Sequence, residues 1–164
     1  MKVTILGCGG SAGVPMLGGQ NGSQTGIWGH CNPQNPKNRR TRSSIVVEGE
    51  DGFRLLVDSG PDFRSQMLNC GLSHIDAVLY THPHSDHIAG LDDLRAINRV
   101  IDKPLPLLAA QSTLEELRQR FAHAFAPWKG PDFYCPVFYQ HVVKTVDDTA
   151  FPCLEVRIFE LRPG

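Results

Sequence analysis

Thr81-His82-Pro83-His84-Ser85-Asp86-His87 is the stretch around which the rest of this chain is organised. Residues 82–87 follow the pattern His-x-His-x-Asp-His. The apolar run before the stretch, Ala77–Tyr80, predicts a short buried strand. After it, apolar residues recur at the spacing of one helix face: Ile88, Leu91, Leu94 and Ile97. The polar motif is therefore expected in the turn between a strand and a helix.

The residue types in this turn indicate a metal site. In a turn, His82 and His84 can point the same way, while Asp86 and His87 open the helix and point to a second place nearby. Imidazole and carboxylate ligands together suit zinc, manganese or iron better than calcium or magnesium. A solvated polar loop would not need so many ligand-type side chains. A structural zinc site would normally use cysteines, and the loop has none.

Composition sets the broad class of the protein. The 164 residues are enough for one domain with a core, and 41% hydrophobic and 20% charged residues are typical of a globular protein. The net charge of −1 argues against a surface that coats nucleic acid. No apolar run approaches the roughly 18 residues of a membrane span. The 5 cysteines are scattered without a Cys-x-x-Cys motif, so we expect a reducing cytoplasm. The N-terminal run Met1–Leu6 is too short, and too soon followed by glycines, for a signal peptide.

The remaining elements alternate between strands and helices. Strands are expected at residues 2–6, 43–47 and 53–57, with the last two forming a hairpin. A helix is expected at 62–70, a strand at 105–109, and a helix from Ser112 to about Phe125 that starts with a Ser112–Glu115 capping box. A loop at 127–136 and strands at 137–143 and 154–161 complete the chain. This order predicts a single α/β domain over residues 1–164.

A glycine-rich turn follows the first strand. Gly7-x-Gly9-x-x-Ala12 could be taken for a dinucleotide fingerprint, but Pro15 blocks the helix that this fingerprint requires. The turn, which includes Ser11, could present backbone N–H groups to an anionic substrate. A plain structural turn explains it equally well.

The long irregular segment 16–42 contains a run of basic residues whose role can be interpreted in two ways. Four basic residues lie within six positions, Arg39 and Arg40 among them, and such a cluster could bind a phosphate. A solvated surface is the other interpretation.

Asp58 stands at the end of an apolar strand. Burying a carboxylate there without partners would be costly, so it is expected to have a specific task. That task could be to orient a metal-bound histidine, and an Asx-type turn is the alternative.

The motif at 82–87 resembles that of the metallo-β-lactamase superfamily of hydrolases. The stretches Gly7–Pro15, Trp28-Gly29 and Asn35–Arg40 resemble the branch that includes the phosphoribosyl cyclic phosphate phosphodiesterases. The resemblance implies a four-layer αββα sandwich built of two similar halves. It also implies that His82 and His84 bind one metal and that Asp86 and His87 bind a second. Asp58 matches a superfamily aspartate before the histidine motif, which favours the orienting role.

The same resemblance implies that the chain covers mainly the N-terminal half of the fold. In the superfamily the second half supplies a further His to each metal and a bridging Asp. His123 and His141 are not assigned to these roles, although His141 is the better candidate. We therefore expect an incomplete domain, which could be a truncated gene product, a fragment or a designed piece.

The function expected from this resemblance is a metal-dependent phosphodiesterase. It would cleave a cyclic phosphate ester through a metal-bound hydroxide, with two Zn or Mn ions per complete site. Asp86 is the expected catalytic residue, and the expected substrate contacts are Ser11, Arg39 and Arg40. Alternatives are hydrolysis of another ester, a thioester, a lactone or RNA, and an inactive fragment. A small phosphate ester is the expected partner, with a homodimer as an optional assembly and neither membrane nor nucleic acid.

Overall fold

A mixed six-stranded sheet forms the centre of the protein, for which the computed structural model describes residues 1–19, 26–126 and 138–143. The strands lie in sequence order across the sheet. They are β1 (Lys2–Gly7), β2 (Ser44–Glu48), β3 (Arg54–Val57), β4 (Ala77–Tyr80), β5 (Leu105–Ala109) and β6 (Phe138–Val142). The predicted α/β class is confirmed, and each strand predicted within the described ranges is present.

The two halves of the sheet are connected differently. β1, β2 and β3 are antiparallel, and the predicted hairpin closes through a bond from Gly49 N to Phe53 O of 2.8 Å. β3 to β6 are parallel. Parallel neighbours need crossover connections, and helical segments follow β3, β4 and β5 for this reason. As a result, the carboxyl ends of β3 and β4 lie side by side at the same end of the sheet.

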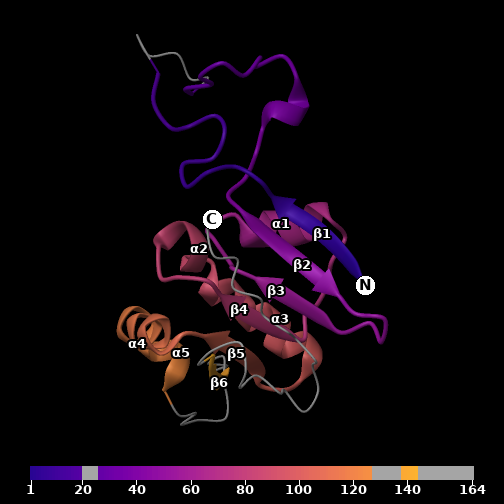
Figure 1. Cartoon of the computed structure of the whole chain (residues 1–164), viewed down its shortest axis with the longest axis vertical. Coiled ribbons are helices and arrows are strands. Elements are labelled where there is room, and N and C mark those ends of the chain that lie inside the picture. The colour runs from indigo at the N-terminus through magenta and orange to yellow at the C-terminus, as the bar shows by residue number, and fades with distance from the viewer. Residues whose placement is uncertain (20–25, 127–137, 144–164) are drawn as a thin grey trace, which may run out of the picture.

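The helices lie on one face of the sheet, behind it in the view of Figure 1. They are α1 (Phe63–Asn69), α2 (Ser85–Ile88), α3 (Leu94–Ile101), α4 (Gln111–Arg120) and α5 (Ala122–Phe125), with the 3-10 turn η2 (Leu91–Asp93). A further 3-10 turn, η1 (Pro36–Asn38), lies in the irregular segment between β1 and β2. Alternate strand residues such as Leu56, Val78 and Leu107 pack against them in the main core. The described residues include no helix that is long and apolar enough to span a membrane.

The helix expected after the histidine motif is divided into α2, η2 and α3. Its apolar stripe is buried as predicted, but the chain turns at Gly90. Gly90 N donates to Ser59 O at 2.8 Å, and a Cβ on Gly90 would overlap Gly60 O. The close approach of these backbones holds α2 as a separate short turn directly above the ends of β3 and β4.

The predicted Ser112–Glu115 capping box is wrong. β5 extends to Ala109, so α4 begins at Gln111, with Ala110 as the extended residue before it. Ser112 therefore lies inside the first turn and cannot cap it. The predicted helix also breaks at Phe121, whose φ of −121° and ψ of 42° separate α4 from α5.

The opposite face of the sheet is apolar, and the described helices do not cover it. Leu55, Ala77 and Leu108 form a small buried cluster there. Towards β1 the face is open, with Ile5 65% exposed beside a shallow hollow of about 390 Å³. The predicted loop 127–136 lies outside the described residues, as does the predicted strand 154–161.

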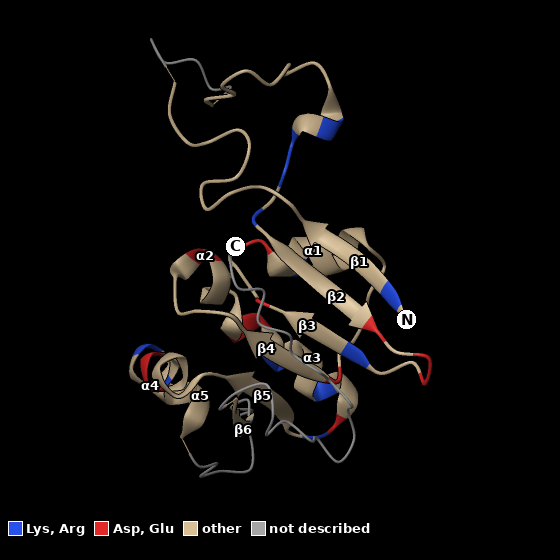
Figure 2. Cartoon of the chain, viewed as in Figure 1, with Lys and Arg blue, Asp and Glu red and all other residues tan. Residues whose placement is uncertain are grey.

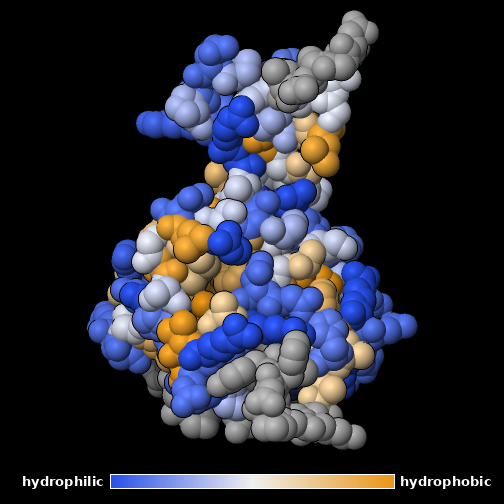
Figure 3. All heavy atoms as spheres, turned by 180° about the vertical axis from the view of Figure 1, so that it is seen from behind, coloured by the Kyte–Doolittle hydropathy of each residue, from blue (hydrophilic) through white to orange (hydrophobic). Residues whose placement is uncertain are grey.

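The irregular segment after β1 projects away from the sheet. Figure 3 shows a narrow waist between this projection and the body of the protein. Isolated β-bridges pair Val14 with Arg40 and Met16 with Ile27, and so connect the outgoing and returning parts of the segment. The 3-10 turn η1 lies near its far end. As expected, no helix begins at the glycine-rich turn directly after β1, so this turn does not have the form of a dinucleotide-binding loop.

Candidate metal centre

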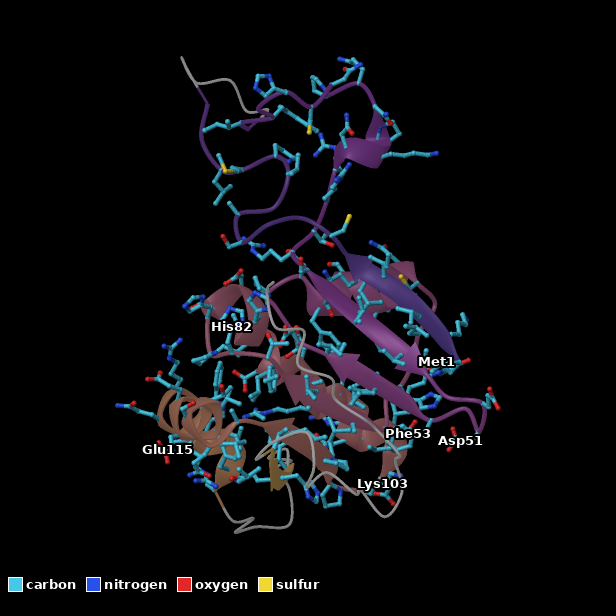
Figure 4. The ribbon with its side chains drawn as sticks, viewed as in Figure 1. Met1, Asp51, Phe53, His82, Lys103 and Glu115 are labelled. Atoms are coloured by element: carbon cyan, nitrogen blue, oxygen red, sulfur yellow. The ribbon has the colours of Figure 1, made fainter. Side chains whose placement is uncertain are left out.

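The predicted ligands gather at the carboxyl ends of two parallel strands. Asp58 follows β3 directly, and Thr81 to His87 follow β4. In Figure 4, His82 lies at the end of the sheet away from Met1 and Phe53. Sites in open α/β sheets commonly occur at the carboxyl ends of the strands, where successive loops leave neighbouring strands.

Asp58 is held in a conformation that few residues adopt. Its φ of 61° is in the left-handed region, which aspartate tolerates better than most non-glycine residues. The residue is only 4% exposed, and its backbone is fixed by bonds from Asp58 N to Leu79 O (2.9 Å) and from Ser44 Oγ to Asp58 O (2.8 Å). Such strain persists where the surroundings impose it, and here it turns the carboxylate towards the loop after β4.

The Asp58 carboxylate accepts three hydrogen bonds from that loop. Oδ1 accepts from Thr81 N at 2.8 Å. Oδ2 accepts from Thr81 Oγ1 at 2.7 Å and from His87 Nδ1 at 2.7 Å. The contact with this carboxylate requires a proton on His87 Nδ1, and in the neutral ring Nε2 then has the lone pair that can bind a metal. The sequence predicted an orienting role for Asp58, and the histidine that its carboxylate contacts is His87.

His82 and His84 form one pair of ring nitrogens. His82 Nε2 lies 3.1 Å from His84 Nδ1. Two nitrogen ligands of one tetrahedral zinc ion lie about 3.3 Å apart, given Zn–N bonds of 2.0–2.1 Å. The spacing of these two nitrogens therefore fits the edge of a single coordination sphere.

Asp86 and His87 form a second pair beside the first. Asp86 Oδ2 lies 3.3 Å from His87 Nε2, and the His82 and His87 ring centres are 4.0 Å apart. Within residues 1–19, 26–126 and 138–143, no group of three or more such side chains shares one metal position. The donor set thus fits divalent metals as two adjacent pairs, each of which would need further ligands.

The surroundings of His82 favour its neutral form. Burial lowers the pKa of His82 below its ordinary value, and positive charge on His87 and His84 would lower it further. A neutral imidazole has a free lone pair, whereas an imidazolium has none.

Three residues that sequence reasoning missed support this loop. Thr81 lies between Asp58 and His82 and could have been suspected from its position before the motif. Tyr80 OH lies 2.5 Å from Ser59 Oγ in the interior, where burial raises the pKa of the phenol. Arg120 of α4 donates to Pro83 O at 2.9 Å. No local pattern marks Arg120, because it is distant from the motif in sequence.

The predicted substrate residues lie in the projection or at its base. The Arg39 guanidinium lies 5.0 Å from the ring centre of Trp28, and Arg40 pairs with Val14 through its backbone. Ser11 O accepts from Arg42 Nε at 2.9 Å, and Arg42 also forms an ion pair with Asp62. Figure 2 shows basic residues along the irregular segment that leads from η1 to β2. None of these recorded contacts reaches the histidines in the described part of the chain, so the substrate role remains a prediction.

The two other histidines considered from sequence lie on different elements. His123 lies on α5, and its Nε2 is 2.7 Å from Asp92 Oδ1 of η2. His141 lies on β6 and pairs in register with Leu108 of β5.

Known proteins resemble this chain in both sequence and fold. A family model described as "Beta-lactamase superfamily domain" matches residues 53–163. A solved diphosphatase of the PhnP family is 34% identical with a TM-score of 0.70, and the match covers 87% of this chain and 50% of that one. Zinc-bound PqqB from Methylobacterium extorquens is 25% identical with a TM-score of 0.63, over 90% of this chain and 47% of that one.

Curated relatives extend the comparison. An octanoyltransferase of Porphyromonas gingivalis is 38% identical over 125 residues, which is 76% of this chain and 24% of that protein. Coenzyme PQQ synthesis protein B of Xanthomonas campestris pv. campestris is 30% identical over 141 residues, which is 77% of this chain and 46% of that protein. The chain thus spans half the length or less of each of these relatives.

Proposed function

Since this chain belongs to the beta-lactamase superfamily, we propose that the protein is a metal-dependent phosphodiesterase that hydrolyses a cyclic phosphate ester. The observation that carries this proposal is the pair of ligand sets after β4, with one imidazole braced by the buried carboxylate after β3. The likeness to a PhnP-family diphosphatase at 34% identity supports a phosphorus-centred substrate.

The residues would divide the metal-binding work between two positions. His82 Nε2 and His84 Nδ1 would hold one divalent cation, and Asp86 Oδ2 and His87 Nε2 would hold another. Zinc and manganese both accept such donors, and the zinc-bound PqqB relative favours zinc. Bound divalent cations supply Lewis acidity, which polarises a phosphoryl oxygen and lowers the pKa of a coordinated water towards neutrality.

The chain's own side chains contribute orientation and proton acceptance. Asp58 fixes the His87 ring through Nδ1, so that Nε2 keeps one direction during the reaction. Asp86 is partly exposed, and its carboxylate can accept a hydrogen bond from the attacking water. Arg39 and Arg40 are exposed cations that could contact phosphate if the projection approaches the site.

A second candidate substrate is a diphosphate. The solved relative with a TM-score of 0.70 carries the name diphosphatase, and cleavage of a phosphoanhydride needs the same placement of cations and water. Direct comparison of a cyclic phosphodiester with a diphosphate ester separates the two proposals by the ratio of their kcat/KM values.

The first experiment measures metal content and turnover on the same preparation. Elemental analysis after zinc or manganese loading should give about two metals per chain, and bis(p-nitrophenyl) phosphate should be hydrolysed. H84A should lose metal and turnover. H74A is the matched control, because His74 lies before β4 and contacts Arg54 and Ser73. Near-zero metal content in the unaltered chain would contradict the proposal and favour the inactive alternative.

A further inference from the structure

The Thr81 hydroxyl lies between the buried carboxylate and a ring of the other ligand pair. Thr81 Oγ1 is 2.7 Å from Asp58 Oδ2 and 2.9 Å from His82 Nδ1. The hydroxyl has one proton to donate, and its oxygen can accept from a second group. Its two contacts therefore cannot both be donations by Thr81.

The direction of each bond follows from the chemistry of the partners. An ionised carboxylate can only accept, so the short contact to Asp58 requires the Thr81 proton. The Thr81 oxygen is then the acceptor for His82, which must carry its proton on Nδ1. The His82 Nε2 lone pair is left facing His84 Nδ1, 3.1 Å away.

We propose that Thr81 is a positioning residue: its hydroxyl relays the orienting effect of Asp58 to His82, so that one buried carboxylate sets one imidazole in each ligand pair. Asp58 acts directly on His87 and through Thr81 on His82. Both rings then have the Nδ1–H tautomer and present Nε2. This inference rests on the proposed function for its purpose, but the tautomer itself can be measured without any metal.

The backbone supports this arrangement as well. Thr81 N donates to Asp58 Oδ1 at 2.8 Å, so Thr81 contacts both oxygens of the carboxylate. Asp58 is only 4% exposed, and its carboxylate cannot turn towards water without losing these bonds. The hydroxyl is therefore held at one position relative to the ring that follows it in the chain.

The test is the tautomer of His82 in the metal-free protein. Long-range 1H–15N correlation spectra at about pH 8, where an ordinary imidazole is neutral, report which ring nitrogen carries the proton. The His82 signals are identified by their loss in H82Q. We expect His82 in the Nδ1–H form in the unaltered chain and in T81S, which keeps the hydroxyl. We expect T81V to shift His82 to a mixture or to the Nε2–H form.

Zinc affinity provides a second readout. Loss of a group that orients a ligand weakens binding about 10-fold to 100-fold, so T81V should bind zinc at least about tenfold more weakly, with recovery in T81S. T4V is the matched control, because Thr4 lies within β1, away from the site, and undergoes the same change of hydroxyl to methyl. T4V should leave both the tautomer and the zinc affinity unchanged.

The outcomes separate this inference from the proposed function. An Nε2–H tautomer of His82 in the unaltered chain would overturn the relay, whether or not zinc binds and whether or not the Thr81 variants fold. The Nδ1–H tautomer together with a shift in T81V would support it, even if the chain hydrolyses no phosphate ester. A T81S protein that behaves like T81V would also overturn it, because the hydroxyl would then be irrelevant.

Discussion

Gly90 N donates to Ser59 O at 2.8 Å and joins the turn after the histidine motif to the end of β3. The contact brings the two backbones so close that Gly90 has no room for a side chain. Ser59 also binds Tyr80 through its hydroxyl, so a single residue after Asp58 contacts both ends of the motif-bearing segment. The position of α2 over the sheet edge depends on these contacts.

Replacing Gly90 with alanine should destabilise the chain. A Cβ there would overlap Gly60 O and press on the Phe63 side chain, and overpacking of this kind costs about 1–3 kcal/mol. Urea denaturation of the metal-free protein measures the loss. G10A is the control, because no atom lies within 4 Å of a Cβ at that position. A G90A protein as stable as the unaltered chain would show that the backbones can separate at little cost.

Replacing Asp58 with asparagine should weaken metal binding and stability together. An amide group offers one oxygen to three donors and turns its own N–H groups towards at least one of them. An unsatisfied buried donor costs about 1–3 kcal/mol, and zinc affinity should fall about 10-fold to 100-fold. Chelator competition and urea denaturation measure the two effects. D51N, in the exposed β2–β3 turn, should change neither, and unchanged zinc affinity in D58N would refute the orienting role.

Arg120 should influence the metal loop without affecting the core. R120M keeps the aliphatic stem but loses the donor to Pro83 O. Since Arg120 is exposed, the free energy of unfolding should change by less than about 1 kcal/mol. Zinc affinity should still fall a few-fold, because the peptide between His82 and His84 gains freedom. R118M is the control on the same helix, since Arg118 contacts Gln140 instead. Equal zinc affinities in the two variants would contradict this role.

Tyr80 should make stability fall at high pH. Burial raises the pKa of its phenol in the folded state, whereas an unfolded tyrosine titrates near pH 10. Above about pH 10 the unfolded chain therefore binds fewer protons than the folded chain, and the free energy of unfolding decreases as pH rises. The decrease should be smaller in Y80F than in the unaltered chain when urea midpoints are compared between about pH 9 and pH 11. Identical pH profiles would contradict the assignment.

Local patterns were sufficient for much of the fold. The apolar runs at Ala77–Tyr80 and Leu105–Ala109 predicted β4 and β5 with the bounds that the structure has, because strand formation by buried aliphatic residues depends on near neighbours. The capping box failed because the end of β5 set where α4 could begin. The helix after the motif was divided for a similar reason, since contact with the backbone after β3 decided where the chain turned.

The sequence by itself determined that His82, His84, Asp86 and His87 lie in one turn, because all four are within six consecutive residues. It also indicated that Asp58 would have a specific task, since a carboxylate after an apolar strand needs partners. Only the tertiary structure decided which partners those are. β3 and β4 pair in parallel, so Asp58 meets Thr81 and His87, which are 23 and 29 positions away in sequence. Hydrogen bonds require atoms within about 3 Å, and sequence spacing fixes such distances only between near neighbours.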